Sequence, residues 1–95
     1  MDSLADQNKL AFMSCVEVVL MRRGNANYHL VMAKLNSLYG CTIIDCYEHV
    51  EYLRDVLKEV YKHDYNLVLD EIQLELLKLV DVEQEIDRFF KIMKG

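Results

Sequence analysis

The sequence predicts an all-α fold, a compact bundle of about five helices. Three observations lead to this prediction. Proline is absent, so no residue of that type interrupts a helix. Apolar residues recur at the three-four spacing of amphipathic helices along most of the chain. The one short β-branched run has no second strand candidate to pair with. A chain of 95 residues fits one domain, and we expect residues 1–95 to form it.

The first helix is predicted at about residues 3–23. Asp2 or Ser3 can cap its N-terminus, and Asp6 suits the first turn because carboxylates there oppose the positive end of the helix dipole. An arginine pair occupies the last turn, where cations are favoured. Both ends of this helix therefore carry the expected signals.

The second half of this helix, residues 10–21, is apolar on nearly every side. Such a helix must be covered all round, and a domain of this size has no spare layer for the far side. The sequence therefore predicts a homodimer, with two copies of the helix packed antiparallel about a two-fold axis. The alternative is a monomer whose other helices wrap this one. The predicted dimer contacts are Phe12, Met13, Val16, Val19 and Leu20.

The second helix is predicted at about 26–39, capped by Asn25. Gly24 and Gly40 each follow a helical pattern, at the position where a helix end favours a left-handed residue. Residues 41–47 begin with β-branched side chains, yet with no partner strand we expect a loop or one-turn helix there.

Three further helices complete the prediction, at about residues 48–62, 65–80 and 82–94, each with apolar residues at helical spacing. We expect Asp64 to cap the helix at 65–80. We expect Asp81 with Gln84 to form a variant of the capping box at the start of the helix at 82–94.

Composition argues against several functions. A net charge of −5 disfavours a nucleic-acid surface, which needs a basic face. No apolar run reaches the roughly 18 residues of a membrane span. Three cysteines, an odd number, suit reduced thiols better than a disulfide framework. We expect a cytoplasmic protein that binds neither nucleic acid nor membrane, and no cofactor, since no phosphate-binding glycine loop is present.

Cys41, Cys46 and His49 are the residues that could carry chemistry. Thiolates and imidazole are zinc ligands, although four are usual and this spacing is uncommon. Cys46 could also act as a nucleophile with His49 as its base. The simpler interpretation is that both cysteines are small buried apolar residues. We expect no catalytic residues and no metal site, with these three residues as the alternative metal set.

The segment 40–61 resembles a family of small archaeal helical domains, the Nitrosopumilus-type output domains, which are attached to or encoded beside signalling proteins. The similarity extends over about residues 28–90. Two positions depart from the family pattern: Val50 stands where the family has proline, and Lys62 where it has glycine. The segments that carry the resemblance are Gly40-Cys41, Asp45-Cys46-Tyr47-Glu48-His49, Tyr52-Leu53 and Val56-Leu57-Lys58-Glu59-Val60-Tyr61.

The resemblance implies a non-catalytic module and supplies no catalytic residues. The leading functional hypothesis is therefore a protein-interaction or signalling-output module, not an enzyme, that binds an unidentified protein partner. The second hypothesis, from another class, is a small metal- or thiol-dependent protein that uses Cys41, Cys46 and His49.

Overall fold

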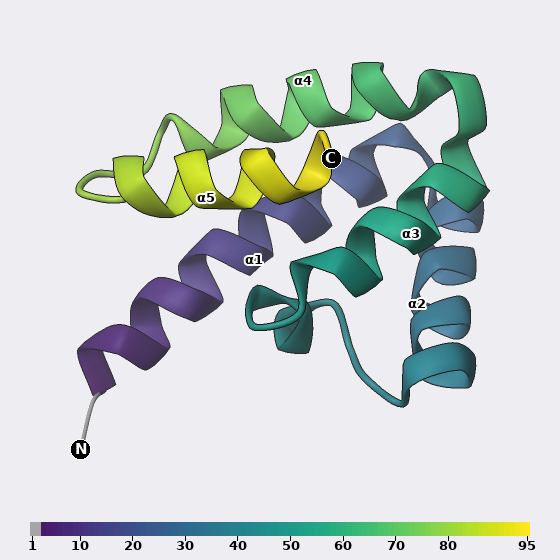
Figure 1. Cartoon of the computed structure of the whole chain (residues 1–95), viewed down its shortest axis with the longest axis horizontal. Helices are drawn as coiled ribbons and strands as arrows, with labels where there is room; N and C mark the ends of the chain where they lie inside the picture. The colour runs from purple at the N-terminus through teal and green to yellow at the C-terminus, as the bar shows by residue number, and fades with distance from the viewer. Residues whose placement is uncertain (1–2) are drawn as a thin grey trace.

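The computed structural model describes residues 3–95, with side chains from Gln7 onward. In this range the chain forms five α-helices, two short 3-10 turns and no β-strand, which confirms the predicted all-α bundle (Figure 1). The elements in chain order are α1 (Ser3–Arg23), α2 (Asn25–Tyr39), η1 (Ile44–Tyr47), α3 (Val50–Tyr61), η2 (Lys62–Asp64), α4 (Tyr65–Leu76) and α5 (Glu83–Met93).

Two helices organise the packing. The first, α1, lies against α2, η1 and α4, and the second, α3, lies against α2, α4 and α5. In Figure 1, α4 runs along one edge of the molecule and α5 returns beside it in the opposite direction. The radius of gyration is 12.6 Å, against about 12 Å for a compact chain of this length. Among the described helices, none has both the length and the apolar character needed to cross a membrane.

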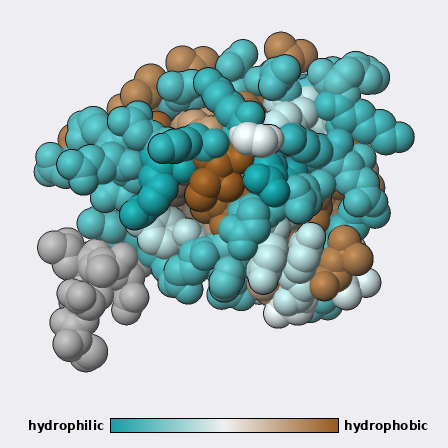
Figure 2. All heavy atoms as spheres, viewed as in Figure 1, coloured by the Kyte–Doolittle hydropathy of each residue, from teal (hydrophilic) through white to brown (hydrophobic). Residues whose placement is uncertain are grey.

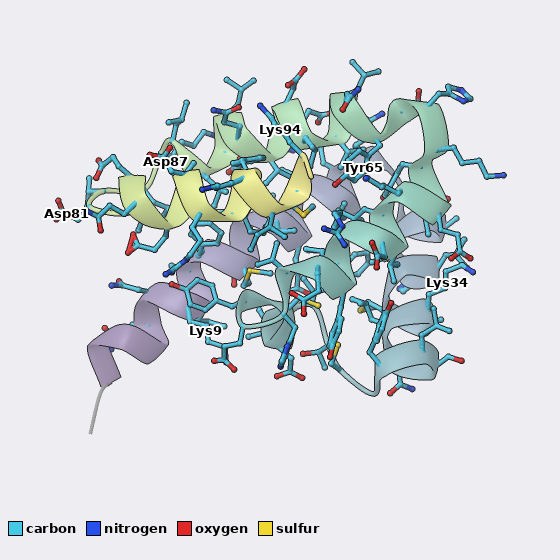
Figure 3. The ribbon with its side chains drawn as sticks, viewed as in Figure 1. Lys9, Lys34, Tyr65, Asp81, Asp87 and Lys94 are labelled. Carbon is cyan, nitrogen blue, oxygen red and sulfur yellow. The ribbon has the colours of Figure 1, made fainter. Side chains whose placement is uncertain are left out.

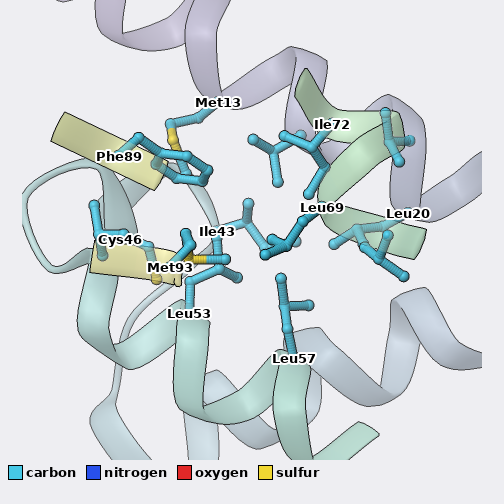
Figure 4. Packing of buried hydrophobic residues seen from close by; sticks show 14 of the residues in the cluster. Met13, Leu20, Ile43, Cys46, Leu53, Leu57, Leu69, Ile72, Phe89 and Met93 are labelled. Atoms are coloured by element: carbon cyan, nitrogen blue, oxygen red, sulfur yellow. The ribbon is translucent and has the colours of Figure 1, made fainter. Parts of the chain in front are cut away.

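The core lies between α1, α3, α4 and α5, and Figure 4 shows its side chains converging from all of these elements. This burial corrects the predicted dimer contacts, because all five residues are core residues of a single chain and none is more than 1% exposed. The packed neighbours α2, η1 and α4 cover the side of α1 that carries them. The corrected residues are Phe12, Met13, Val16, Val19 and Leu20.

The opposite side of α1 does remain in solvent. Leu10, Val18 and Met21 are 55%, 40% and 41% exposed. The other helices therefore cover only one side of α1. The covered side is the one that was predicted to contact a second copy. A pattern that is apolar all round does not indicate which face the fold will use.

The two predicted glycine turns differ. Gly40 has the expected left-handed conformation, with φ 63°, and its N–H donates to the carbonyl of Asn36. Gly24 instead adopts φ 141° and ψ 128°, which only glycine tolerates readily, and as the single residue between α1 and α2 it turns the chain at once. Because α2 begins at Asn25, that residue is the first of the helix and not its cap.

The segment predicted as a loop or one-turn helix contains η1, a single 3-10 turn. The Thr42 N–H donates to Asp45 Oδ2 at 3.0 Å, and the Asp45 N–H donates back to Thr42 Oγ1 at 3.3 Å. This reciprocal pair closes the turn in the manner of a capping box. The backbone N–H of Thr42 also lowers the pKa of the Asp45 carboxyl, because it stabilises the charged form.

Several predicted ends and caps are corrected. The fourth helix ends at Leu76 and not at residue 80, and the fifth begins at Glu83. Asp64 makes no capping bond through its side chain. Asp81 has φ 59° and so turns the chain ahead of α5 instead of capping it (Figure 3). Asp2 and the side chains of Ser3 and Asp6 lie outside the described residues.

Candidate functional site

The structure brings the two predicted thiols together. Cys41 Sγ lies 3.9 Å from Cys46 Sγ, because the Gly40 turn and η1 fold this segment back on itself. Cys46 is completely buried in the core, and its burial, together with the neighbouring Cys41, raises the pKa of its thiol. A buried thiol that keeps its proton is a poor nucleophile, because the thiolate is the reactive form.

His49 does not join the two thiols. Its ring stacks on Tyr52, with centroids 4.8 Å apart, and its Nδ1 lies 3.8 Å from a carboxylate oxygen of Glu51. Within the described part of the chain, no three histidine, cysteine or acidic side chains are placed to hold a metal ion together. The predicted trio is therefore a thiol pair with a separate surface histidine.

A concavity lies elsewhere, between α5 and the start of α3. We call it the α3–α5 groove, and its volume is about 330 Å³. Its apolar lining is supplied by Phe12, Val50, Phe89 and Ile92, from three different helices. The Phe12 and Phe89 rings meet edge to face at 5.3 Å, which fixes the base of the groove. Figure 2 shows an apolar patch at the centre of this face, within a hydrophilic surround.

The rim of the groove is polar and mostly acidic. Glu48 and Glu51 stand at the start of α3, while Glu85 and Arg88 stand on α5. Lys9 Nζ reaches Glu48 Oε1 at 2.9 Å and joins α1 to the rim (Figure 3). Tyr47 completes the lining from η1, with its ring edge-to-face on Phe12 at 5.7 Å. The groove thus offers an apolar base within a charged border.

The apolar and charged residues of the groove can both contact a bound molecule. Neither a cysteine nor a histidine lines the groove. The carboxylates Glu48 and Glu51 are 63% and 47% exposed at their side chains, so water screens their charges. The arrangement can hold an apolar group and attract charge, which are properties of a binding surface.

The sequence alone does not reveal that the groove residues lie close together in the fold. Phe12 precedes Ile92 by most of the chain, and their meeting depends on how α5 packs beside α3. One sequence feature points to the groove. Ile92 adds to the apolar stripe formed by Ile86, Phe89 and Phe90, so the apolar face of α5 is wider than a single layer of neighbours covers.

A second surface feature lies along the outer side of α4 and the turn after it. Four large aliphatic side chains there are between 55% and 80% exposed. We call this set the α4 leucine row. Apolar side chains follow the upper edge of the molecule in Figure 2. The members of the row are Leu67, Leu74, Leu77 and Val80.

Comparisons of the chain with models of protein families, with curated proteins and with solved structures find no match.

Proposed function

We propose that the protein is a non-catalytic interaction module that acts by binding a protein partner in the α3–α5 groove. The observation that carries this proposal is an apolar hollow of about 330 Å³ bordered by four charged side chains. Protein interfaces have this organisation, with an apolar centre that loses its water and a polar rim that stays wet. The resemblance of residues 40–61 to archaeal output domains supports signalling as the setting.

The alternative, a metal- or thiol-dependent protein, has less support. It requires Cys41, Cys46 and His49 to act together, and the His49 ring lies on Tyr52 instead. The raised pKa of the Cys46 thiol also opposes a reactive thiolate. An interaction module needs neither property.

A matched pair of variants tests the proposal. Ile92→Asn makes the base of the groove polar without adding charge, while Leu38→Asn makes the same kind of change at a leucine on α2 that is 58% exposed. Each immobilised protein is incubated with a lysate of the source cell, and the retained proteins are quantified by mass spectrometry. We expect a partner that the unmodified protein and Leu38→Asn retain and that Ile92→Asn loses.

Two checks make the result interpretable. Circular dichroism and melting must show that Ile92→Asn stays folded, since Ile92 is half-buried. Glu85→Arg, at the rim, is a second groove variant that leaves the apolar base in place. If every retained protein binds equally to the unmodified protein and to both groove variants, the groove is not the binding surface and the proposal fails.

We also propose that the protein forms a weak homodimer, through the α4 leucine row and not through α1. Asp70 lies in α4 and Lys78 in the turn after it, so an antiparallel pair about a two-fold axis near Leu74 brings Asp70 of each copy towards Lys78 of the other. Lys78 is 70% exposed at its side chain and only loosely held, at 3.3 Å, by Glu75. The row is therefore self-complementary in charge as well as apolar.

Light scattering at tens of micromolar tests the dimer. We expect a dimer mass for the unmodified protein and for Leu38→Lys, and a monomer mass for Leu74→Lys, which places a cation on the two-fold axis. The row has few side chains compared with the roughly 20–30 residues per partner of stable complexes, so the dimer should dissociate on dilution. A monomer mass for the unmodified protein at this concentration contradicts the proposal.

A further inference from the structure

The carboxylates of the groove are unequally neutralised. Glu48 has Lys9 at 2.9 Å, and Glu51 has only the His49 ring nitrogen, at 3.8 Å. Glu85 has no hydrogen-bond or ion-pair partner among the described residues. Two carboxylates, one from α3 and one from α5, therefore face the groove without a fixed cation of their own.

The apolar base between them is small. About 330 Å³ is at the lower limit of the roughly 300–1,000 Å³ of small-molecule sites. This space holds one or two large side chains better than a whole cofactor. Val50 and Ile92 line it, while the Phe12 ring, 1% exposed, closes it from below. A lysine or arginine fits such a site, because its aliphatic stem packs on apolar surface while its charged end stays at the polar border.

We propose that the groove accepts a basic segment of the partner, in which lysine or arginine stands next to a large apolar residue. This inference rests on the proposed function and adds the chemistry of the partner. The apolar residue lies on Ile92 and Val50, and the cations meet Glu51 and Glu85. The net charge of −5 also attracts a basic partner from a distance. Acidic segments meet repulsion at the same rim.

Arg88 makes the inference testable in two directions. It lines the groove on α5, three residues after Glu85, and it is the only cation among the lining residues. A basic segment is repelled by Arg88, so Arg88→Gln should tighten binding. Glu85→Gln should weaken it. A purely structural role for either side chain gives no reason for opposite effects, and neither residue belongs to the buried core.

The experiment begins with a phage-displayed library of short random peptides. Phage that bind the unmodified protein are retained, and phage that also bind Ile92→Asn are discarded. We expect the selected peptides to combine lysine or arginine with large apolar residues. Their dissociation constants, measured by fluorescence anisotropy, should rise about threefold to fivefold with Glu85→Gln and fall by a similar factor with Arg88→Gln. Glu83→Gln, on α5 but outside the groove, is the matched control and should change nothing.

The outcomes separate the two proposals. Selected peptides that need Ile92 but are acidic or uncharged overturn the inference and leave the interaction module standing. The same holds if Glu85→Gln and Arg88→Gln change affinity in the same direction. If no peptide and no cellular partner depends on Ile92, the proposed function fails, and the inference fails with it.

Discussion

The hydroxyl of Tyr65 donates a hydrogen bond of 2.6 Å to the backbone carbonyl of Met93, and so joins the first residue of α4 to the last residue of α5. One turn earlier, the Tyr61 hydroxyl is also buried but has no hydrogen-bond partner among the described residues. Each tyrosine is 7% exposed. The chain therefore contains two tyrosines of equal burial that differ in one bond.

Replacing each tyrosine by phenylalanine should change the free energy of unfolding differently, because only one of the two hydroxyls is hydrogen-bonded. Tyr65→Phe leaves the Met93 carbonyl without its partner and should lower the free energy of unfolding by about 1–2 kcal/mol. Tyr61→Phe removes a buried hydroxyl that makes no bond, so it should be neutral or stabilising by up to about 1 kcal/mol. Urea unfolding of the two variants measures the difference. Equal losses would mean that the Tyr61 hydroxyl has a partner in solution.

Stability in alkali provides a second test of Tyr65. Burial raises the pKa of Tyr65 to about 12, against about 10 in an unfolded chain. Because the folded-state pKa is the higher one, the stabilisation is fully present below pH about 10 and is lost as the pH rises towards about 12. The unfolding free energies of the unmodified protein and Tyr65→Phe should therefore converge between these pH values.

Measuring a difference between two proteins is necessary here. Hydrogen bonding to Glu17 raises the pKa of Tyr28, and burial raises the pKa of Tyr61, so both also destabilise the fold in alkali. These effects are common to the unmodified protein and to Tyr65→Phe, and they cancel in the comparison. A gap that stays constant from pH 9 to pH 12 would show that the Tyr65 hydroxyl titrates normally.

Cys46 should behave as a core residue. Its side chain is completely buried, and that burial raises the pKa of the thiol. A thiol reagent should therefore modify Cys46 more slowly than Cys41, which is half-buried. Cys46→Ser should cost about 1–3 kcal/mol, because it buries a hydroxyl where the thiol had little need of a partner. Cys41→Ser should cost less than 1 kcal/mol. Mass spectrometry of partially modified protein and urea unfolding give the two readouts.

Zinc should not stabilise the protein. Of the three residues in the alternative metal set, only Cys41 and Cys46 are adjacent, and structural zinc sites use four ligands. We expect the melting temperature to stay the same when zinc is added and when a chelator is added. One zinc bound per chain, with unfolding on chelation, would favour the metal-dependent hypothesis.

The sequence predicted those features that depend on neighbouring residues. The described helices occupy the segments that the three-four pattern predicted, although the fourth ends four residues early, and Gly40 has the left-handed conformation expected after a helix. The single turn at Ile44–Tyr47 also follows from local chemistry, since Thr42 and Asp45 cap it within four residues. Features of this kind need no knowledge of the rest of the fold.

Features that depend on packing were not predicted. Leu74 has the spacing of a core residue but is 67% exposed, whereas Val16 was expected at an interface and is fully buried. In a helix with apolar residues on several faces, the choice of buried face depends on which helices become neighbours. The groove depends on packing even more, because Phe12 and Ile92 line the same hollow only after α1, α3 and α5 have packed.

The backbone of Lys62 carries local strain. With φ 52° and ψ −119°, it has the conformation of the first central residue of a type II′ turn, where glycine is strongly preferred. Lys62 lies between the buried residues Tyr61 and Tyr65, at the junction of α3 and η2. Both tyrosines belong to the buried core.

Lys62→Gly should therefore stabilise the protein. A side chain in a sparsely populated backbone region costs about 1–3 kcal/mol, and the flexibility of glycine in the unfolded chain offsets roughly 0.5–1 kcal/mol of the relief. We expect a net gain of about 1 kcal/mol in urea unfolding. His63→Gly is the matched control, because His63 is exposed in the same turn and has a negative φ. That variant has no strain to relieve and should lose up to about 1 kcal/mol. If both variants lose stability equally, Lys62 does not adopt this conformation in solution.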